Sequence, residues 1–234
     1  MCNDCLDAGL SRRKILLSAA GLLAAAPLAG MAQAQPVAAA DTPDAALHLL
    51  IEGNARYVAN QTRESDFSAA RASRTQGQAP FAAILGCADS RVAPELAFDQ
   101  GPGDLFVVRV AGNFVTLEGL ASLEFGAAVL GTKLIMVLGH NSCGAVNATV
   151  TALQKGDTLP VHIADLVRAM KPGIEPVLKQ SATIYNSAPL SPTCATTPSA
   201  CSTRSQSWPK MRAKNEVHAV GAIYDLATKK LTLV

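Results

Sequence analysis

The 234-residue chain is long enough for one domain with a sizeable core, and 49% hydrophobic against 16% charged residues is a globular composition. Its formal net charge of +2 leaves no excess of basic surface, which argues against nucleic acid as a partner. Six cysteines are too few and too scattered for a disulfide framework, so the class of small disulfide-bonded scaffolds is excluded.

The N-terminal segment has the layout of an export signal. Arg12 and Arg13 precede an apolar run rich in Ala and Leu that continues to about Ala29. The small residues of Ala32–Ala34 then stand where a signal peptidase cleaves. Two arginines followed by Lys14 and two leucines resemble a signal of the twin-arginine type.

We therefore expect residues 1–34 to be a cleaved twin-arginine signal peptide and residues 35–234 to form the mature domain. This predicts a bacterial protein exported to the periplasm and not held in the membrane after cleavage. The alternative is a single membrane anchor. The apolar run is broken by Pro27 and is short for a span of about 20 strongly apolar residues, so it favours cleavage.

Apolar runs and amphipathic segments alternate along the rest of the chain. In chain order, the pattern predicts a helix over 42–60, strands over 81–86 and 105–110, a helix over 116–130, a strand over 133–139, helices over 145–154 and 162–170, and strands over 219–226 and 230–234. Apolar strands that alternate with helices imply an α/β fold with a mainly parallel central β-sheet and flanking helices. The short turn between the last two strands predicts an antiparallel strand at the C-terminal edge.

Residues that bind metals follow the first and third predicted strands. Cys87 comes directly after one apolar run, and His140 and Cys143 come directly after another. Since open α/β sheets place their sites at the carboxyl ends of strands, we expect the three side chains to meet. Two thiolates and one imidazole suit zinc and leave the fourth tetrahedral position open, as in catalytic zinc sites. Without Cys87, the other two residues would be read as a core histidine and a buried free cysteine.

Asp89 and Arg91 stand two residues apart in the segment that follows Cys87. In an extended segment, residues at this spacing point the same way, so the carboxylate and the guanidinium can pair through two hydrogen bonds. The alternative is a structural ion pair. Its position beside three potential metal ligands favours a role in catalysis.

The sequence C-x-D-S-R at Cys87–Arg91, followed by G-H-x-x-C-G at Gly139–Gly144, resembles the signature of the β-class carbonic anhydrases. The resemblance runs from about residue 42 to 180 and from 210 to the end, through EGNARYV, GQAPFAAILGCADSRVAPELAFDQGPGDLFVVRVAGN, SLEFGAAVLG and VGAIYDL. It implies the fold of that family and one Zn²⁺ per subunit. It also implies reversible hydration of carbon dioxide to bicarbonate and a proton by zinc-bound hydroxide.

The resemblance also implies residue roles at the metal. The ligands would be Cys87, His140 and Cys143. In the active form, Asp89 would pair with Arg91 and accept a hydrogen bond from the zinc-bound hydroxide, which makes both residues catalytic. In a resting form, Asp89 would move onto the metal as a fourth ligand.

Substrate contacts and assembly follow from the same resemblance. Gln78, Phe106 and Gly144 match residues that bind the substrate. Phe125 stands where some members have a tyrosine, so a substrate hydrogen bond from that position is lost here. Sites of this family form at a dimer interface, which predicts a homodimer or a higher homo-oligomer.

The segment 181–209 departs from the family, which has a long helix there. It is rich in Ser, Thr and Pro, as in a disordered linker, and such a linker is unusual inside a compact domain. In a reading frame shifted by one base, the codons permitted from Cys194 onward include V-R-D-N-A-E-R-L-L-D-K-V-A-V-L-A, an amphipathic helix. We hypothesise two compensating frameshifts, which would make Cys194 and Cys201 their products. The alternative is a genuine insertion, and the gene's nucleotides distinguish the two.

Two other functions stay open from the sequence. One is a non-catalytic zinc-binding family member, disabled by its altered segment 181–209. The other is a related hydrolase that acts on another small linear molecule. The presence of Asp89 and Arg91 favours the enzyme, because an inert zinc site would need neither.

Overall fold

A computed structural model describes residues 40–63, 71–156, 159–180 and 217–234 of the chain. The expectations for the export signal at 1–34 and for the segment 181–209 lie outside these described residues. Within the described part, no helix is long and apolar enough to cross a membrane.

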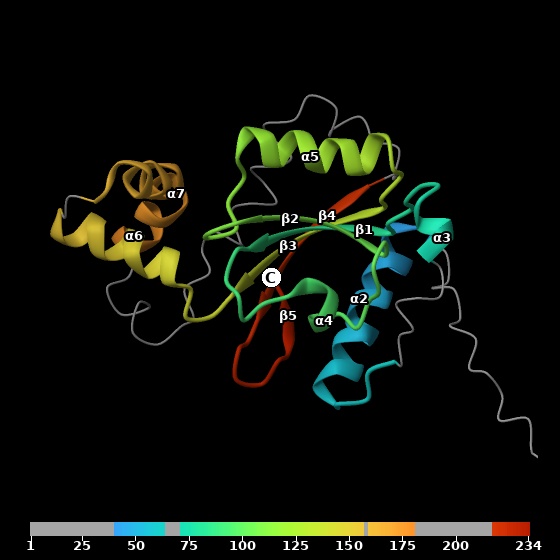
Figure 1. The fold of residues 1–234 in the computed structure, drawn as a ribbon. Coiled ribbons are helices and arrows are strands. Elements are labelled where there is room, and N and C mark those ends of the chain that lie inside the picture. The colour runs from blue at the N-terminus through green and yellow to red at the C-terminus, as the bar shows by residue number, and fades with distance from the viewer. Residues whose placement is uncertain (1–39, 64–70, 157–158, 181–216) are drawn as a thin grey trace, which may run out of the picture. The chain divides into compact units, whose positions relative to one another are not determined.

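The centre of the fold is a five-stranded sheet in the order β2-β1-β3-β4-β5 (Figure 1). The first four strands run parallel, and β5 pairs antiparallel with β4 at the edge. The strands are β1 (Ala82–Cys87), β2 (Leu105–Val110), β3 (Leu134–His140), β4 (His218–Tyr224) and β5 (Leu231–Leu233). The α/β fold class, the mainly parallel sheet and the antiparallel C-terminal edge strand are thus confirmed.

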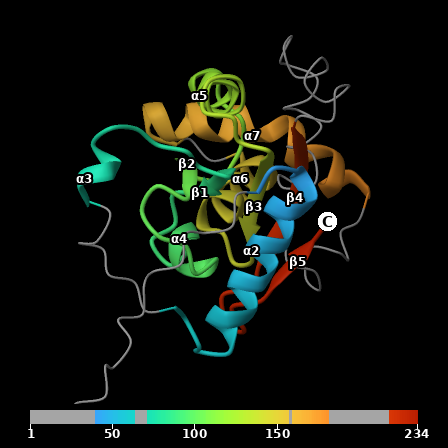
Figure 2. The same ribbon diagram turned by 90° about the vertical axis from the view of Figure 1, so that its right-hand side faces the viewer.

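Helices cover both faces of the sheet (Figures 1 and 2). They are α2 (Pro43–Val58), α3 (Arg71–Arg74), α4 (Pro94–Ala97), α5 (Leu117–Ala128), α6 (Gly144–Lys155) and α7 (Val161–Gln180). Figure 1 shows α5 on one face and α2 with α4 on the other. Helices α6 and α7 pack against one another beyond the carboxyl end of β3.

Alternation along β1 explains why both faces are covered. Ile84 joins the buried cluster that includes Leu50 of α2, whereas Leu85 joins the cluster that includes Leu123 of α5. Successive side chains of a strand point to opposite faces, so a continuous apolar run supplies two cores at once. All six residues of β1 are buried. The buried strand therefore fixes where the residue at its end, Cys87, is placed.

Helix α7 is longer than the sequence pattern predicts. The expected helix over 162–170 continues to Gln180, through Pro172 and Pro176. A proline inside a helix removes a hydrogen bond and costs about 3 kcal/mol, which is why the pattern indicated an earlier end. Ile174 is fully buried in the cluster that α7 shares with α6, and this burial offsets the cost.

Candidate metal centre

Three potential metal ligands meet at the carboxyl ends of two adjacent parallel strands. Cys87 is the last residue of β1, His140 is the last residue of β3, and Cys143 is the N-cap of α6. Their ligand atoms all lie within 4.8 Å of one another, and all three residues are buried. The structure thus brings together the three side chains that the sequence places after two separate strands.

The geometry of this cluster fits zinc. The two sulfur atoms, Sγ of Cys87 and Sγ of Cys143, are 3.8 Å apart. Two thiolates at the usual bond length of about 2.3 Å from a tetrahedral zinc ion would stand about 3.8 Å apart. The same spacing is too long for a disulfide bond of about 2.05 Å. Cys87, Cys143 and His140 together therefore offer an S₂N donor set of suitable size.

The imidazole of His140 is oriented for metal binding. Its Nδ1 lies 2.8 Å from the carbonyl oxygen of Asn141, and since a carbonyl only accepts, Nδ1 carries the proton. Its Nε2 is buried and has no hydrogen-bond partner among the described residues. A buried nitrogen without a partner is costly, and a metal ion would satisfy it.

The two thiols are not equivalent. A hydrogen bond from the Cys143 thiol is the main cause that lowers the pKa of Cys87 to about 4, although burial opposes the shift. The nearby His140 ring and the backbone N–H groups of Gly112 and Asp89 also contribute to lowering this pKa. The pKa of Cys143 is raised, because its proton is donated to Cys87 and because it is buried. Of the two thiols, Cys87 therefore loses its proton more readily than Cys143.

The pKa of His140 also depends on the neighbouring Cys87 thiolate. Burial alone would lower the pKa of His140, but the neighbouring Cys87 thiolate and the Asn141 carbonyl favour the protonated ring, and the pKa is raised. A metal ion that binds here must displace the proton of Cys143 and any proton on Nε2 of His140.

Asp89 and Arg91 form the expected bidentate pair. Nε of Arg91 donates to Oδ1 of Asp89 at 2.9 Å, and Nη2 donates to Oδ2 at 2.7 Å. These hydrogen bonds hold the pKa of Asp89 well below its usual range. Oδ2 of Asp89 lies 3.7 Å from Nε2 of His140, so the ionised carboxylate stands at the rim of the cluster. In this arrangement Arg91 binds the carboxylate, and a fourth-ligand role for Asp89 stays a prediction.

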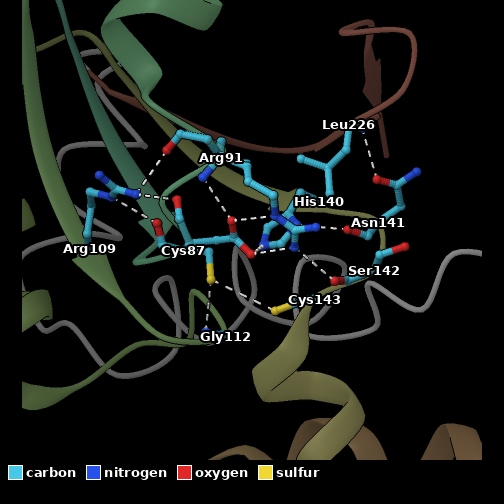
Figure 3. A network of polar contacts seen from close by, with 11 residues as sticks. Cys87, Arg91, Arg109, Gly112, His140, Asn141, Ser142, Cys143 and Leu226 are labelled. Carbon is cyan, nitrogen blue, oxygen red and sulfur yellow. Dashed lines mark hydrogen bonds and ion pairs between the residues drawn. The ribbon is translucent and has the colours of Figure 1, made fainter.

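Arg109 of β2 is a site residue that the sequence reasoning missed. Its guanidinium donates to three backbone carbonyls, those of Cys87 at 2.8 Å, Asp89 at 2.7 Å and Val92 at 2.9 Å (Figure 3). These carbonyls lie at and beyond the end of β1, where the ladder to β2 stops. Arg109 therefore fixes the loop that carries Asp89 and Arg91. A charged residue inside the apolar run LFVVRV was the available signal.

The expected substrate-binding residues do not all lie at this cluster. Gly144 does, as the first residue of α6 beside Cys143. Gln78 precedes β1, and it lines an open hollow with Pro102 and Gly103, which precede β2. Phe106 is the second residue of β2 and pairs in register with Ala83, four residues before Cys87 in β1.

Gln78 and Phe106 are thus near the amino ends of the parallel strands, whereas the cluster is at the carboxyl ends. Four residues of strand span about 13 Å. Phe106 contacts α5, where its ring centroid lies 6.4 Å from that of Phe125. Within one chain, these residues are not brought to the three potential metal ligands.

Comparisons with known proteins agree with this chemistry. A family model described as carbonic anhydrase matches residues 82–231. The chain is 49% identical over 133 residues to a carbonic anhydrase of Mycolicibacterium smegmatis, a match that covers 56% of this chain and 65% of that relative. The match thus spans less than two thirds of the relative's length.

Solved structures give the same fold. The β-carbonic anhydrase CcaA superposes with a TM-score of 0.63 at 24% identity, covering 80% of this chain and 86% of that one. A Coccomyxa β-carbonic anhydrase in complex with acetazolamide gives a TM-score of 0.60 at 26% identity, again covering 80% of this chain and 86% of that one.

Proposed function

The chain belongs to the carbonic anhydrase family, since the family model matches residues 82–231, and we propose that it catalyses the reversible hydration of carbon dioxide to bicarbonate. The cofactor proposed is one Zn²⁺ per subunit, held by Cys87, His140 and Cys143. The observation that carries the proposal is the meeting of these three donors beside an ionised Asp89–Arg91 pair. When bound, zinc supplies Lewis-acid chemistry that makes water acidic near neutral pH.

Asp89 orients the attacking water in this proposal. Two side-chain hydrogen bonds from Arg91 keep the carboxylate ionised, and a third, from the backbone N–H of Arg91 at 2.9 Å, fixes Oδ1. A carboxylate with so low a pKa is a poor proton carrier at neutral pH, but it is a strong hydrogen-bond acceptor. Asp89 therefore aligns the water and does not remove its proton.

The surroundings of the donors protect them from solvent on one side. Cys87 and Cys143 pack in a buried cluster with Val146, Val150 and Met170. This apolar wall shields the sulfur atoms from water on the side of α6 and α7. Arg109 holds the loop after β1 through its backbone carbonyls, and Arg91 ties this loop to the carbonyl of Ser142.

We extend the proposal to a homodimer or higher homo-oligomer. Gln78 and Phe106 lie near the opposite end of the strands from the three donors, so they reach substrate only if a second copy supplies them. The exposed side chain of Phe125 on α5 provides apolar surface for such a contact. Oligomeric state in solution, measured by sedimentation, tests this extension.

We also propose export by a twin-arginine signal at residues 1–34. Reduced thiols such as those of Cys87 and Cys143 are at risk in an oxidising periplasm, and loading of zinc before export would protect them. Replacement of Arg12 and Arg13 by Lys should leave active enzyme in the cytoplasm. Undiminished export of the double variant would contradict the assignment.

Stopped-flow measurement of carbon dioxide hydration tests the proposed function. Protein loaded with one zinc per chain should accelerate hydration well above the uncatalysed rate. A zinc-loaded protein with no acceleration would overturn the enzyme and support the non-catalytic alternative.

A further inference from the structure

The turn between His140 and Cys143 decides whether these two donors converge. It contains two residues, Asn141 and Ser142. Ser142 has a φ of +52°, in the left-handed region that residues with a side chain rarely adopt. Such a conformation persists only where surrounding contacts hold it. Arg91 supplies one of them, since its Nη2 donates to the Ser142 carbonyl at 3.2 Å.

The side chain of Asn141 supplies further contacts, and both ends of its amide are used. Nδ2 donates to Oδ2 of Asp225 at 2.7 Å. Oδ1 accepts from the backbone N–H of Leu226 at 2.9 Å (Figure 3). The backbone N–H of Asn141 also donates to the carbonyl of Tyr224 at 3.3 Å. The turn between His140 and Cys143 is therefore hydrogen-bonded to a segment more than 80 residues away, where β4 ends.

The segment that Asn141 contacts is itself rigidly built. Oδ1 of Asp225 accepts from the backbone N–H groups of Ala227 and Thr228 and from the hydroxyl of Thr228, at 3.0, 2.7 and 2.9 Å. The β4–β5 turn is thus folded around one oxygen of Asp225, and the other oxygen reaches Asn141.

Asn54 anchors this hairpin to α2. The side chain of Asn54 donates to the carbonyl of Lys229 at 2.9 Å and accepts from the backbone N–H of Leu231 at 3.0 Å. Asn54 is buried, with 6% of its surface exposed. The β4–β5 hairpin is therefore held firmly against α2, and its hydrogen bonds to Asn141 restrain that residue.

Asn141 transmits this restraint to the donor ring. Its carbonyl accepts the Nδ1 proton of His140, so the residue tied to the hairpin also sets the tautomer and the direction of the imidazole. We propose that Asn141 is a positioning residue for the metal, and that its hydrogen bond to Asp225 holds the turn in the geometry that joins His140 to Cys143. This inference rests on the proposed zinc site and adds the residue pair that preorganises it.

Zinc affinity of the Asn141→Ala variant tests the inference. Loss of an outer hydrogen bond to a metal site typically lowers metal affinity about 10- to 100-fold, and we expect a loss in this range in competition with a chelator. The cobalt-substituted variant should show an altered visible spectrum, because the ring direction changes. Asn147→Ala is the matched control, since Asn147 is exposed on α6 just beyond the turn, and its zinc affinity should equal that of the unmodified chain.

A reciprocal exchange separates the direct contact from a general loss of stability. Asn141→Asp alone places two carboxylates face to face and should weaken zinc binding at least as much as Asn141→Ala. Adding Asp225→Asn places an amide N–H donor at position 225 opposite the carboxylate acceptor at position 141. That carboxylate still accepts from the backbone N–H of Leu226. The double variant should therefore recover most of the zinc affinity. The thermal midpoint of each metal-free variant shows which of them fold.

The outcomes distinguish this inference from the function on which it rests. If the unmodified chain binds no zinc, the proposed function fails. If it binds zinc and folded Asn141→Ala has the same affinity and cobalt spectrum, the positioning role is overturned. A double variant that folds but binds zinc no better than Asn141→Asp would overturn the direct role of the Asn141–Asp225 contact.

Discussion

The residues at the two ends of the parallel strands differ in how far a single chain buries them and holds them in place. At the carboxyl ends, Cys87, His140 and Cys143 are buried, and hydrogen bonds hold the loops that carry them. At the amino ends, Gln78 is exposed beside an open hollow, and the side chain of Phe125 on α5 is 47% exposed. The carboxyl end thus holds a complete set of potential metal ligands, whereas the amino end presents the expected substrate-binding Gln78 in the open. In the proposed function, a single chain preorganises the metal donors, and a second copy supplies the rest of the site.

Replacement of His140 should have the largest effect on zinc binding and activity. This effect should be confined to the site at the carboxyl ends of the parallel strands. His140→Ala deletes one of three protein ligands, so we expect loss of stoichiometric zinc and a fall in carbon dioxide hydration of about 10³-fold or more. Elemental analysis and stopped-flow kinetics measure the two effects. Full zinc content in the variant would show that the metal lies elsewhere.

Asp89→Asn should separate chemistry from metal binding. The substitution removes the negative charge that orients water but leaves all three buried donors, so the rate should fall by about 10²-fold or more while zinc stays bound. Asp165→Asn is the matched control, because Asp165 also pairs with an arginine, Arg168, but lies exposed on α7. An undiminished rate in Asp89→Asn would remove the carboxylate from the mechanism.

A mixed assembly tests whether the two ends work together across subunits. Gln78→Ala should lower the rate about tenfold or more without loss of zinc, because the proposed hydrogen bond to the substrate is lost. When equal amounts of Gln78→Ala and His140→Ala chains assemble together, about half of the dimers are hybrids with one complete site, so about a quarter of the original activity should return. Activity no higher than the sum of the separate variants would place Gln78 in its own chain's site or outside any site.

A smaller expected effect is the pH dependence of zinc binding by the three donors at the carboxyl ends of the strands. Without metal, the pKa of Cys87 is lowered to about 4, that of Cys143 is raised and that of His140 is raised. Zinc binds the deprotonated donors, so affinity should rise with pH through the neutral range, with about one to two protons released per zinc. Calorimetry in buffers of different ionisation enthalpy measures this number. The Gln78→Ala variant should release the same number, and an affinity independent of pH would contradict the proton balance.

Most of the sheet could be predicted from local pattern alone. The apolar runs that end at Gly86 and Gly139 are long and continuous, and the strands lie within one residue of them. Because parallel strands end at one edge, the same pattern predicts that Cys87, His140 and Cys143 meet. The bidentate pair of Asp89 with Arg91 follows from their spacing of two.

Other features needed the fold itself. Arg109 acts by donating to backbone carbonyls after β1, and Asn141 acts by binding Asp225, more than 80 residues away. A short window of sequence shows neither of these contacts. Helix α7 continues through Pro172 because tertiary burial outweighs the local preference.

X-ray absorption at the zinc edge of the full chain tests the central claim most directly. We predict one zinc per chain with two sulfur neighbours at about 2.3 Å and nitrogen or oxygen neighbours at about 2.0–2.1 Å. The Cys143→Ser variant should lose one of the two sulfur neighbours. A folded chain without zinc, or a zinc ion with no sulfur neighbour, would contradict the account of Cys87, His140 and Cys143 as one metal centre.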